Sequence, residues 1–191
     1  MSLNRVLHQV RACTVCGDLP LGPRPVLQVA RSARLLIVGQ APGRKVHETG
    51  VPWNDASGER LRHWMGIERS AFYDKECVAI VPIGLCYPGS APGGGDKPPR
   101  RECAPLWHAR LLEHLGDIRL TLLVGSHAQR FYLRSAGKAT MTETVRSFRQ
   151  YAPQFMTLPH PSWRSTVWMR QNPWFEATVL PELRRTLCAL A

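Results

Sequence analysis

The sequence contains a glycine-rich loop at a position where many α/β proteins bind ligands. Gly39-Gln40-Ala41-Pro42-Gly43 follows directly after the apolar run of residues 35–38. In open α/β sheets, ligands bind just beyond the carboxyl ends of the strands. The spacing differs from the dinucleotide fingerprint and from a phosphate loop that ends in Gly-Lys-Ser/Thr. We therefore expect a ligand site that holds no nucleotide cofactor, and the alternative is an ordinary turn after a strand.

Several cysteines have a spacing that suits metal binding. Cys13 and Cys16 are separated by two residues, so both thiolates can bind one metal ion or cluster. Cys86 and Cys103 border irregular backbone, from which a ligand can be directed freely. The four residues are either one metal site or four unrelated buried thiols, because free cysteines are often part of a core.

The pattern of apolar residues predicts the elements that position these side chains. Strand-like runs cover residues 35–38, 78–85, 120–125 and 155–158, and helical patterns cover 3–12, 59–65, 104–115, 126–132 and the stretch from 172 to the C-terminus. Ser126 is expected to cap its helix, and a polar, hairpin-like region is expected over 138–149. Strands that alternate with helices predict one three-layer α/β/α domain over residues 1–191, with a central, mostly parallel four-stranded sheet.

Charge and composition restrict the classes of function. The 191 residues are 44% hydrophobic, enough for one well-buried domain. Lys and Arg outnumber Asp and Glu by 25 to 14, which gives a net charge of +11. Such a charge favours a polyanionic partner, and nucleic acid is the first candidate. The sequence has no apolar run long enough to span a bilayer, so we expect no membrane partner.

The N-terminus and the cysteines bear on the cellular compartment. The first residues lack the apolar core of a secretory signal, so we expect an intracellular protein. Its six cysteines are then not a disulfide framework. Cys77 begins an apolar run and Cys188 lies among leucines of the last helix, so both are expected to be small core residues.

Three motifs, in this order, resemble those of the uracil-DNA glycosylase superfamily. They are Gly39-Gln40-Ala41-Pro42-Gly43, then Thr49-Gly50-Val51-Pro52-Trp53 with Ser57-Gly58, then Leu158-Pro159-His160-Pro161-Ser162. The resemblance runs from Cys13 to Pro173 and is to a divergent subgroup near the bacterial and archaeal iron–sulfur type, family 4. That type carries Cys-x-x-Cys, a long gap, Cys, a gap in the mid-teens, and Cys. Here 69 residues separate Cys16 from Cys86, and 16 separate Cys86 from Cys103.

The resemblance implies an activity, a cofactor and a partner. It implies a DNA repair enzyme, a monofunctional uracil-DNA glycosylase that flips a deaminated base out of DNA and hydrolyses its N-glycosidic bond, leaving an abasic site. It raises Cys13, Cys16, Cys86 and Cys103 to a [4Fe-4S] site, with zinc as the alternative. We expect a monomer that acts on uracil-containing DNA in the bacterial cytoplasm, at the nucleoid.

The resemblance also assigns roles to individual residues. His160 would stabilise negative charge on the leaving base, and Trp53, where the family has Phe, would stack on that base. The base pocket would comprise Gly39, Ala41, Pro42, Gly43, Trp53 and Asn54, with Gln40 helping to hold the attacking water. DNA phosphates would contact Ser162 and Arg164, with Lys45, Arg44 and Arg170 as weaker candidates.

The chain departs from the family at three polar positions. Gln40 replaces Glu and can orient a water but cannot act as a base, and an acidic position further along falls at Val46. The Asn that reads uracil falls at Pro82, which has neither a side-chain donor nor an N–H, and Asn54 is one candidate substitute. Discrimination that depends on a hydrogen-bonded edge weakens without its partner. We therefore predict a broader base tolerance that includes hypoxanthine and xanthine.

Asp55 is the remaining candidate carboxylate. It lies two residues after Trp53 and could activate the water or stabilise the sugar cation. The alternative is that Asp55 caps the following helix, because Asp is a preferred N-cap residue.

Other interpretations of the chain stay open. The loss of three polar positions is consistent with a non-catalytic protein that binds damaged or single-stranded DNA and carries an iron–sulfur cluster. An electron carrier is disfavoured, because such carriers usually gather their cysteines more closely in sequence. His47 resembles the loop histidine through which one branch of the superfamily links itself covalently to abasic DNA. The loop here lacks the inserted basic run of that branch.

Overall fold

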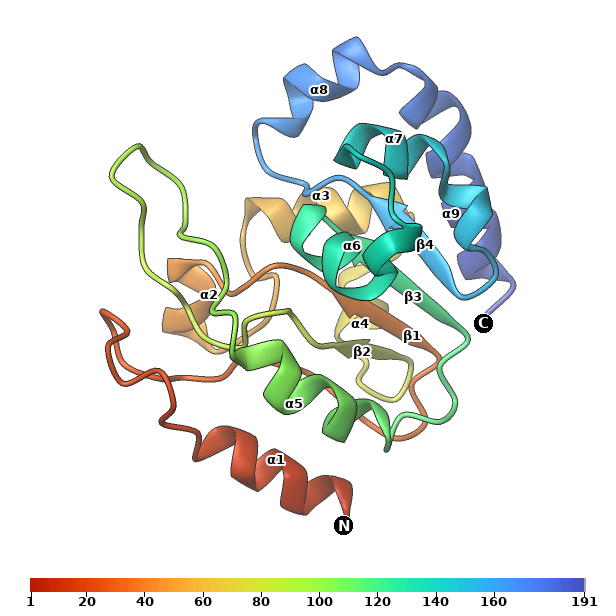
Figure 1. The fold of residues 1–191 in the computed structure, drawn as a ribbon. Coiled ribbons are helices and arrows are strands. Elements are labelled where there is room, and N and C mark those ends of the chain that lie inside the picture. Colours follow the sequence, from red (N-terminus) through yellow and green to blue (C-terminus); the bar gives the residue numbers. More distant parts are fainter. Residues whose placement is uncertain (191) are drawn as a thin grey trace.

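A four-stranded, all-parallel sheet forms the centre of the molecule (Figure 1). The structure is a computed structural model, and it describes residues 1–190. The strands are β1 (Leu35–Val38), β2 (Val78–Ile80), β3 (Leu120–Val124) and β4 (Phe155–Leu158), arranged in the order β2-β1-β3-β4. Every residue of β1, β2 and β3 is buried, as expected for parallel strands covered on both faces. The predicted three-layer α/β/α fold is confirmed.

Helices cover both faces of this sheet (Figure 1). One face packs against α1 (Leu3–Arg11), α5 (Cys103–Leu112) and α6 (Ser126–Leu133). The other packs against α3 (Ala56–Met65), α4 (Arg69–Tyr73), α7 (Met141–Arg146) and α9 (Leu180–Cys188), which continues a π-helical turn (Phe175–Val179). Two further helices, α2 (Arg44–Thr49) and α8 (Ser165–Gln171), follow the loops after β1 and β4. Short 3-10 turns span Arg134–Ala136 and Phe148–Tyr151.

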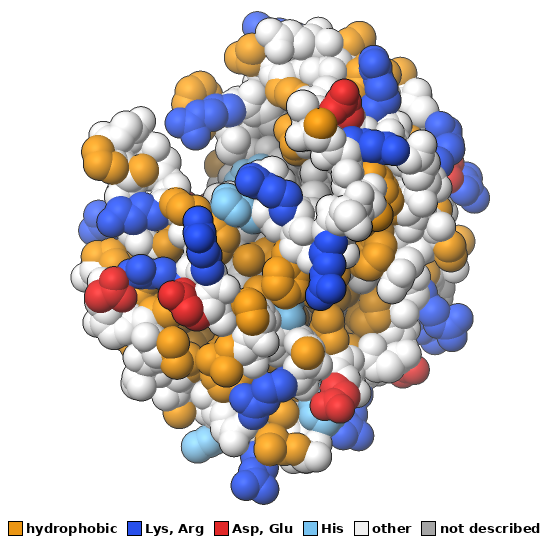
Figure 2. Space-filling model, viewed as in Figure 1, with side chains coloured by type: hydrophobic (Ala, Val, Ile, Leu, Met, Phe, Trp, Pro, Cys, Tyr) orange, Lys and Arg blue, Asp and Glu red, His pale blue; other side chains and the backbone are white. Residues whose placement is uncertain are grey.

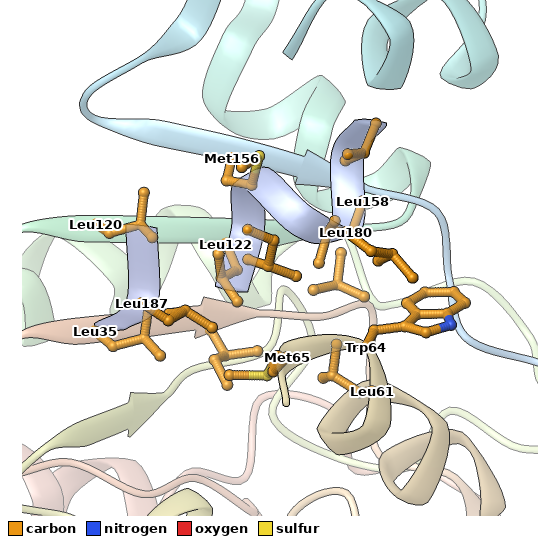
Figure 3. Close-up of a cluster of buried hydrophobic side chains, with 14 of the residues drawn as sticks. Leu35, Leu61, Trp64, Met65, Leu120, Leu122, Met156, Leu158, Leu180 and Leu187 are labelled. Atoms are coloured by element: carbon orange, nitrogen blue, oxygen red, sulfur yellow. The ribbon is translucent and has the colours of Figure 1, made fainter. Parts of the chain in front are cut away.

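Alternate side chains of each strand pack into two separate hydrophobic cores, one on each face of the sheet. Leu35 and Ile37 of β1 join the cluster under α3 and α9, whereas Leu36 and Val38 join the cluster under α1 and α5. This division follows from the two-residue period of a strand. Figure 3 shows part of the first cluster, where Trp64 of α3 lies beside leucines from β4 and α9. The two cores hold the sheet, and with it the loops at its carboxyl end, in a fixed position.

Several expected boundaries are wrong. The second strand ends at Ile80 instead of residue 85, because its partner β1 ends at Val38, and beyond that point Ile83 and Gly84 donate to the carbonyls of the loop residues Gly39 and Gln40. The region 138–149 is not a hairpin but contains α7, which begins with a capping box between Thr140 and Glu143. Ser126 is the first residue of α6 rather than its cap, and Gly125, with φ 88°, takes the cap position.

Two cysteines also lie elsewhere than expected. Cys77 and Cys188 are exposed, so the prediction that they are core residues is wrong. Cys77 ends the turn before β2, where its Sγ donates to Asp74 (3.4 Å), and Cys188 is the last residue of α9. Both positions lie at the ends of elements, where a side chain can leave the packed face.

Candidate active site

A cavity of about 80 Å³ opens at the carboxyl end of β1. The loop after β1, the start of α3 and the segment after β4 meet there, and the lining includes Gly39, Gln40, Ala41, Pro42, Gly43, Trp53, Asp55, Pro82, Asp96 and His160. A larger, open groove of about 1000 Å³ runs beside α1 and shares only Pro52 with this cavity. The smaller cavity therefore collects nearly all the residues predicted to form the base pocket.

Trp53 forms one wall of the cavity in an unusual backbone conformation. Its φ is 55°, a left-handed value that is uncommon for a bulky residue. A Cβ on Gly58 would lie 1.8 Å from the Trp53 carbonyl oxygen, and a Cβ on Gly39 would lie 2.7 Å from the indole ring. The buried Arg62 guanidinium donates to the same carbonyl (3.4 Å). Glycine is therefore required at 58, and Gly39 lets the indole lie directly against the loop after β1.

His160 lines the same cavity and pairs with Trp53. The two ring centroids are 5.8 Å apart, and the rings are inclined by 32°. Burial lowers the pKa of His160 to about 4, although the negative charge of Asp55 opposes this shift. The imidazole is therefore neutral at pH 7, and it can donate one hydrogen bond and accept another.

The segment that carries His160 is anchored by a residue of α3. The Arg60 guanidinium donates to the carbonyl oxygens of Pro161 and Ser162 and to Ser165 Oγ (3.2 Å). Ser165 Oγ also donates to the Ser162 carbonyl oxygen (2.6 Å). This network connects the helix that follows Trp53 with the segment that follows β4, so both walls of the cavity are held in one arrangement.

Asp55 is confirmed as the N-cap of α3. Its Oδ1 accepts a hydrogen bond from the amide of Gly58 (2.8 Å), which is the geometry of an N-cap. Its Oδ2 points toward the loop after β1 and lies 3.8 Å from the position of a Cβ on Gly43. Asp55 therefore stabilises the helix and at the same time presents a carboxylate oxygen to the cavity.

The structure does not bring together Pro82, its candidate substitute Asn54 and the proposed water-orienting Gln40. Gln40 and Pro82 line the cavity, but Asn54 does not, and its Oδ1 accepts from Arg69 (3.0 Å). The carbonyl oxygen of Pro82 points away from the cavity to Nε2 of the buried His108 (3.0 Å). Within residues 1–190, Gln40 is consequently the residue with an amide side chain that lines the cavity.

The structure adds Asp96, which the sequence pattern did not single out. Asp96 lies in the Pro/Gly-rich segment between β2 and α5, and its carboxylate reaches the mouth of the cavity. A Cβ on Gly43 would lie 3.3 Å from its Oδ2. Periodicity cannot show where an irregular segment folds back, so the sequence carried no signal for this placement.

A family model described as the Uracil DNA glycosylase superfamily matches residues 27–184. The chain belongs to the uracil DNA glycosylase superfamily. Membership supports a DNA glycosylase, a hydrolase that acts on DNA, as its general class. Cys13 and Cys16 precede the matched range, so the match does not bear on the iron–sulfur subgroup. Within residues 1–190 of this glycosylase, no helix is long and apolar enough to cross a bilayer.

Basic side chains are prominent on the surface of the molecule. On the face shown in Figure 2, Lys and Arg side chains greatly outnumber Asp and Glu side chains. Arg44, Lys45, Arg164 and Arg170 are exposed, and Ser162 is partly exposed, so all five predicted phosphate contacts are accessible. Arg44 is already paired with Glu48 on α2 (3.0 Å).

An exposed tryptophan adds to this surface. Trp163 is 71% exposed, three residues after His160, and the Arg164 guanidinium lies 5.0 Å from the centre of its ring. Aromatic side chains on a basic surface can stack on unpaired bases. An apolar residue inside a polar loop is the signal that could have identified Trp163 from sequence.

The four cysteines predicted to bind a metal line one small cavity of the glycosylase. Cys13, Cys16, Cys86 and Cys103 come together between the segment after α1 and the start of α5. The amide of Leu85 donates to Cys103 Sγ (3.2 Å), and burial raises the pKa of the Cys86 thiol to about 12. No group of three or more His, Cys, Asp and Glu side chains within residues 1–190 has an arrangement suited to a metal ion. The structure thus brings the four cysteines to one cavity, but within residues 1–190 their thiols are not arranged as ligands of a single metal ion.

Proposed function

We propose that this protein is a monofunctional glycosylase that removes uracil from DNA and accepts deaminated purines as well. The observation that carries the proposal is the pairing of Trp53 with His160 across one cavity, beside the main chain of residues 39–43. A flipped base needs an aromatic surface to stack on and a donor for its edge. This cavity supplies both within a superfamily of DNA glycosylases.

The chemistry follows from the charges that develop. When the bond between C1′ and the base nitrogen breaks, the sugar becomes cationic and the base becomes anionic. A neutral His160 would donate a hydrogen bond to the base carbonyl and stabilise the negative charge. The free Oδ2 of Asp55 would stabilise the positive charge on the sugar, and Gln40 would orient water beside the backbone of residues 40–43.

The proposed tolerance for purines rests on Pro82. Pro82 lines the cavity, has no N–H and directs its carbonyl to His108, so it offers the base no hydrogen bond. Asn54 lies outside the cavity, and Gln40, the amide side chain that does line it, is assigned to the attacking water. A site without a fixed amide contact discriminates poorly between base edges, which supports acceptance of hypoxanthine and xanthine.

We further propose that Cys13, Cys16, Cys86 and Cys103 hold a [4Fe-4S] cluster. Two observations support the fit: the four residues line one cavity, and a backbone N–H already donates to one of the sulfurs. Four thiolates are the ligand set of such clusters, and hydrogen bonds to sulfur tune them. When bound, the cluster would connect the segment after α1 to the start of α5 and supply structural rather than chemical support to the cavity.

The surface around the cavity is proposed to bind DNA. Ser162 and Arg164 lie directly after His160, and Arg44, Lys45 and Arg170 flank them as further phosphate contacts. Trp163 would stack against bases next to the extruded one. These contacts would release counterions, so binding should weaken steeply with salt.

The deciding experiment uses labelled DNA with a single uracil, hypoxanthine, xanthine or mismatched thymine. The protein is incubated with each substrate, abasic sites are cleaved with alkali, and the products are separated on a denaturing gel. Strand cleavage at uracil and at a purine supports the proposed enzyme. No cleavage on any substrate, together with tight binding to uracil-containing DNA, would instead establish a non-catalytic binding protein, which the loss of three polar positions favours as the second candidate.

A further inference from the structure

An ordered arm brings an additional carboxylate to the cavity. Residues 88–99 leave the body of the molecule after β2 and return before α5, as the light green loop of Figure 1 shows. The arm is closed by its own hydrogen bonds: Ala91 donates to the Gly95 carbonyl (2.9 Å) and Lys97 donates to the Gly89 carbonyl (2.8 Å). Ser90 and Asp96 form an antiparallel bridge within it. The position of Asp96 is therefore set by the arm's own backbone pairing.

The arm turns Asp96 toward the reaction site. The Oδ2 atoms of Asp96 and Asp55 both approach Gly43, at 3.3 Å and 3.8 Å from the position of its Cβ. Within residues 1–190, Asp55 and Asp96 are the two acidic residues that line the cavity, and His160 lines it as well. The space beside Gly43 consequently lies between two carboxylates and the main chain proposed to hold water.

We propose that Asp96 is the carboxylate that accepts a proton from the attacking water. This inference rests on the proposed function and assigns the base of that reaction. The water oxygen forms a bond to C1′ while the bond from C1′ to the base nitrogen breaks, and the electron pair leaves with the base. One proton of the water passes to the Asp96 carboxylate and then to solvent, and the anionic base takes a proton from solvent. No other reactant is required.

The surroundings favour Asp96 over Asp55 for this step. One oxygen of Asp55 is committed to the amide of Gly58, whereas Asp96 has no side-chain hydrogen bond within the described part of the chain. The side chain of Asp96 is exposed overall, but its partial desolvation at the mouth of the cavity raises its pKa, and the charge of Asp55 raises it further. A raised pKa makes a carboxylate a better proton acceptor. Two further charged groups face the arm: the Arg164 guanidinium lies 3.4 Å from the position of a Cβ on Gly95, and Asp18 lines a pocket together with Lys97 of the arm.

The test compares single-turnover excision of uracil by the wild-type chain and four variants of it. Asp96→Asn should slow excision at least ~100-fold, the lower limit for removal of a general base, and leave affinity for uracil-containing DNA unchanged. Asp96→Glu should restore part of the rate. Asp117→Asn is the matched control, because Asp117 is exposed in the turn before β3, at the opposite end of the sheet. In the wild type the rate should fall as the pH drops and Asp96 is protonated, and Asp96→Asn should lose this acid limb.

Two outcomes would overturn the inference, and they are distinguishable. An active wild type and an equally fast Asp96→Asn variant would overturn the role of Asp96 alone. An inactive wild type would overturn the proposed function and this inference with it. Asp55→Ser, which keeps a capping oxygen at the start of α3, completes the set. If Asp55→Ser abolishes the acid limb and Asp96→Asn does not, the base is Asp55.

Discussion

The ring centroids of Trp53 and His160 lie 5.8 Å apart in the lining of one cavity, although the two residues belong to segments that follow different strands. Neither position is independent of the rest of the fold. Trp53 is held by contacts with Gly39 and Gly58, and the segment of His160 is held by Arg60 of α3. The cavity therefore keeps its shape only while both of these sets of contacts are formed.

Replacement of His160 tests the proposed donor to the base. His160→Gln should slow uracil excision by about 10²–10³-fold, the usual cost of removing one preorganised donor, with little change in DNA binding. Single-turnover rates and fluorescence anisotropy measure the two quantities. His63→Asn is the control, because His63 is exposed on α3. A His160→Gln variant that binds uracil-containing DNA much more weakly but excises at the wild-type rate would contradict this role.

Protonation of His160 gives a second test of the same residue. Its pKa is lowered to about 4 by burial, whereas the unfolded chain takes up the proton near pH 6.5. Below pH 6.5 the unfolded state therefore binds more protons than the folded state, and stability should fall as the pH drops from 6.5 to 4. His160→Gln should reduce this loss when melting temperature is followed against pH. An identical pH dependence in both proteins would show that His160 is not buried in its neutral form.

Substitution of Gly39 tests the close contact with Trp53. In Gly39→Ala, the new Cβ would lie 2.7 Å from the indole, so the ring must move from the cavity wall. We expect uracil excision to fall at least ~10-fold and the free energy of unfolding to fall by about 1–3 kcal/mol, as for other overpacked sites. Gly116→Ala is the control, because a Cβ there would meet no atom within 4 Å. Wild-type activity of Gly39→Ala would show that the indole position is unimportant.

Introduction of an amide at Pro82 tests the proposed base tolerance. Pro82→Asn places a side chain with a donor and an acceptor at the cavity lining. The ratio of uracil excision to hypoxanthine excision should rise at least ~10-fold, because a hydrogen-bonding site rejects an edge that leaves it unpaired. Pro98→Asn, in the exposed arm, is the control. An unchanged ratio would mean that Pro82 does not determine the breadth of substrates.

Single cysteine replacements test the proposed cluster. Cys86→Ser and Cys103→Ser should lose bound iron and visible absorption and should melt at a lower temperature, because both residues line the shared cavity. Cys77→Ser and Cys188→Ser are matched controls, since both residues are exposed and neither lines that cavity. Full iron content in Cys103→Ser, or zinc in place of iron in the wild type, would contradict the proposal.

Sequence by itself determined the layers of this protein and the approximate place of its site. Short, uninterrupted apolar runs bounded by turn residues, such as residues 35–38, indicate strands buried on both faces, and glycine-rich loops after such strands lie at one edge of a parallel sheet. Asp55 was correctly recognised as a possible cap, because capping depends on local spacing.

Tertiary structure alone decided which of the candidates meet. Asn54 accepts a hydrogen bond from Arg69 outside the cavity, whereas Asp96 lines the cavity. Neither placement could be predicted, because the path of an irregular segment depends on its own hydrogen bonds and leaves no periodic pattern in the sequence. The same limit applies to Cys77 and Cys188, whose exposure depends on where their elements end. Local pattern thus specifies elements, whereas the direction of a side chain in a loop depends on contacts between residues far apart in the chain.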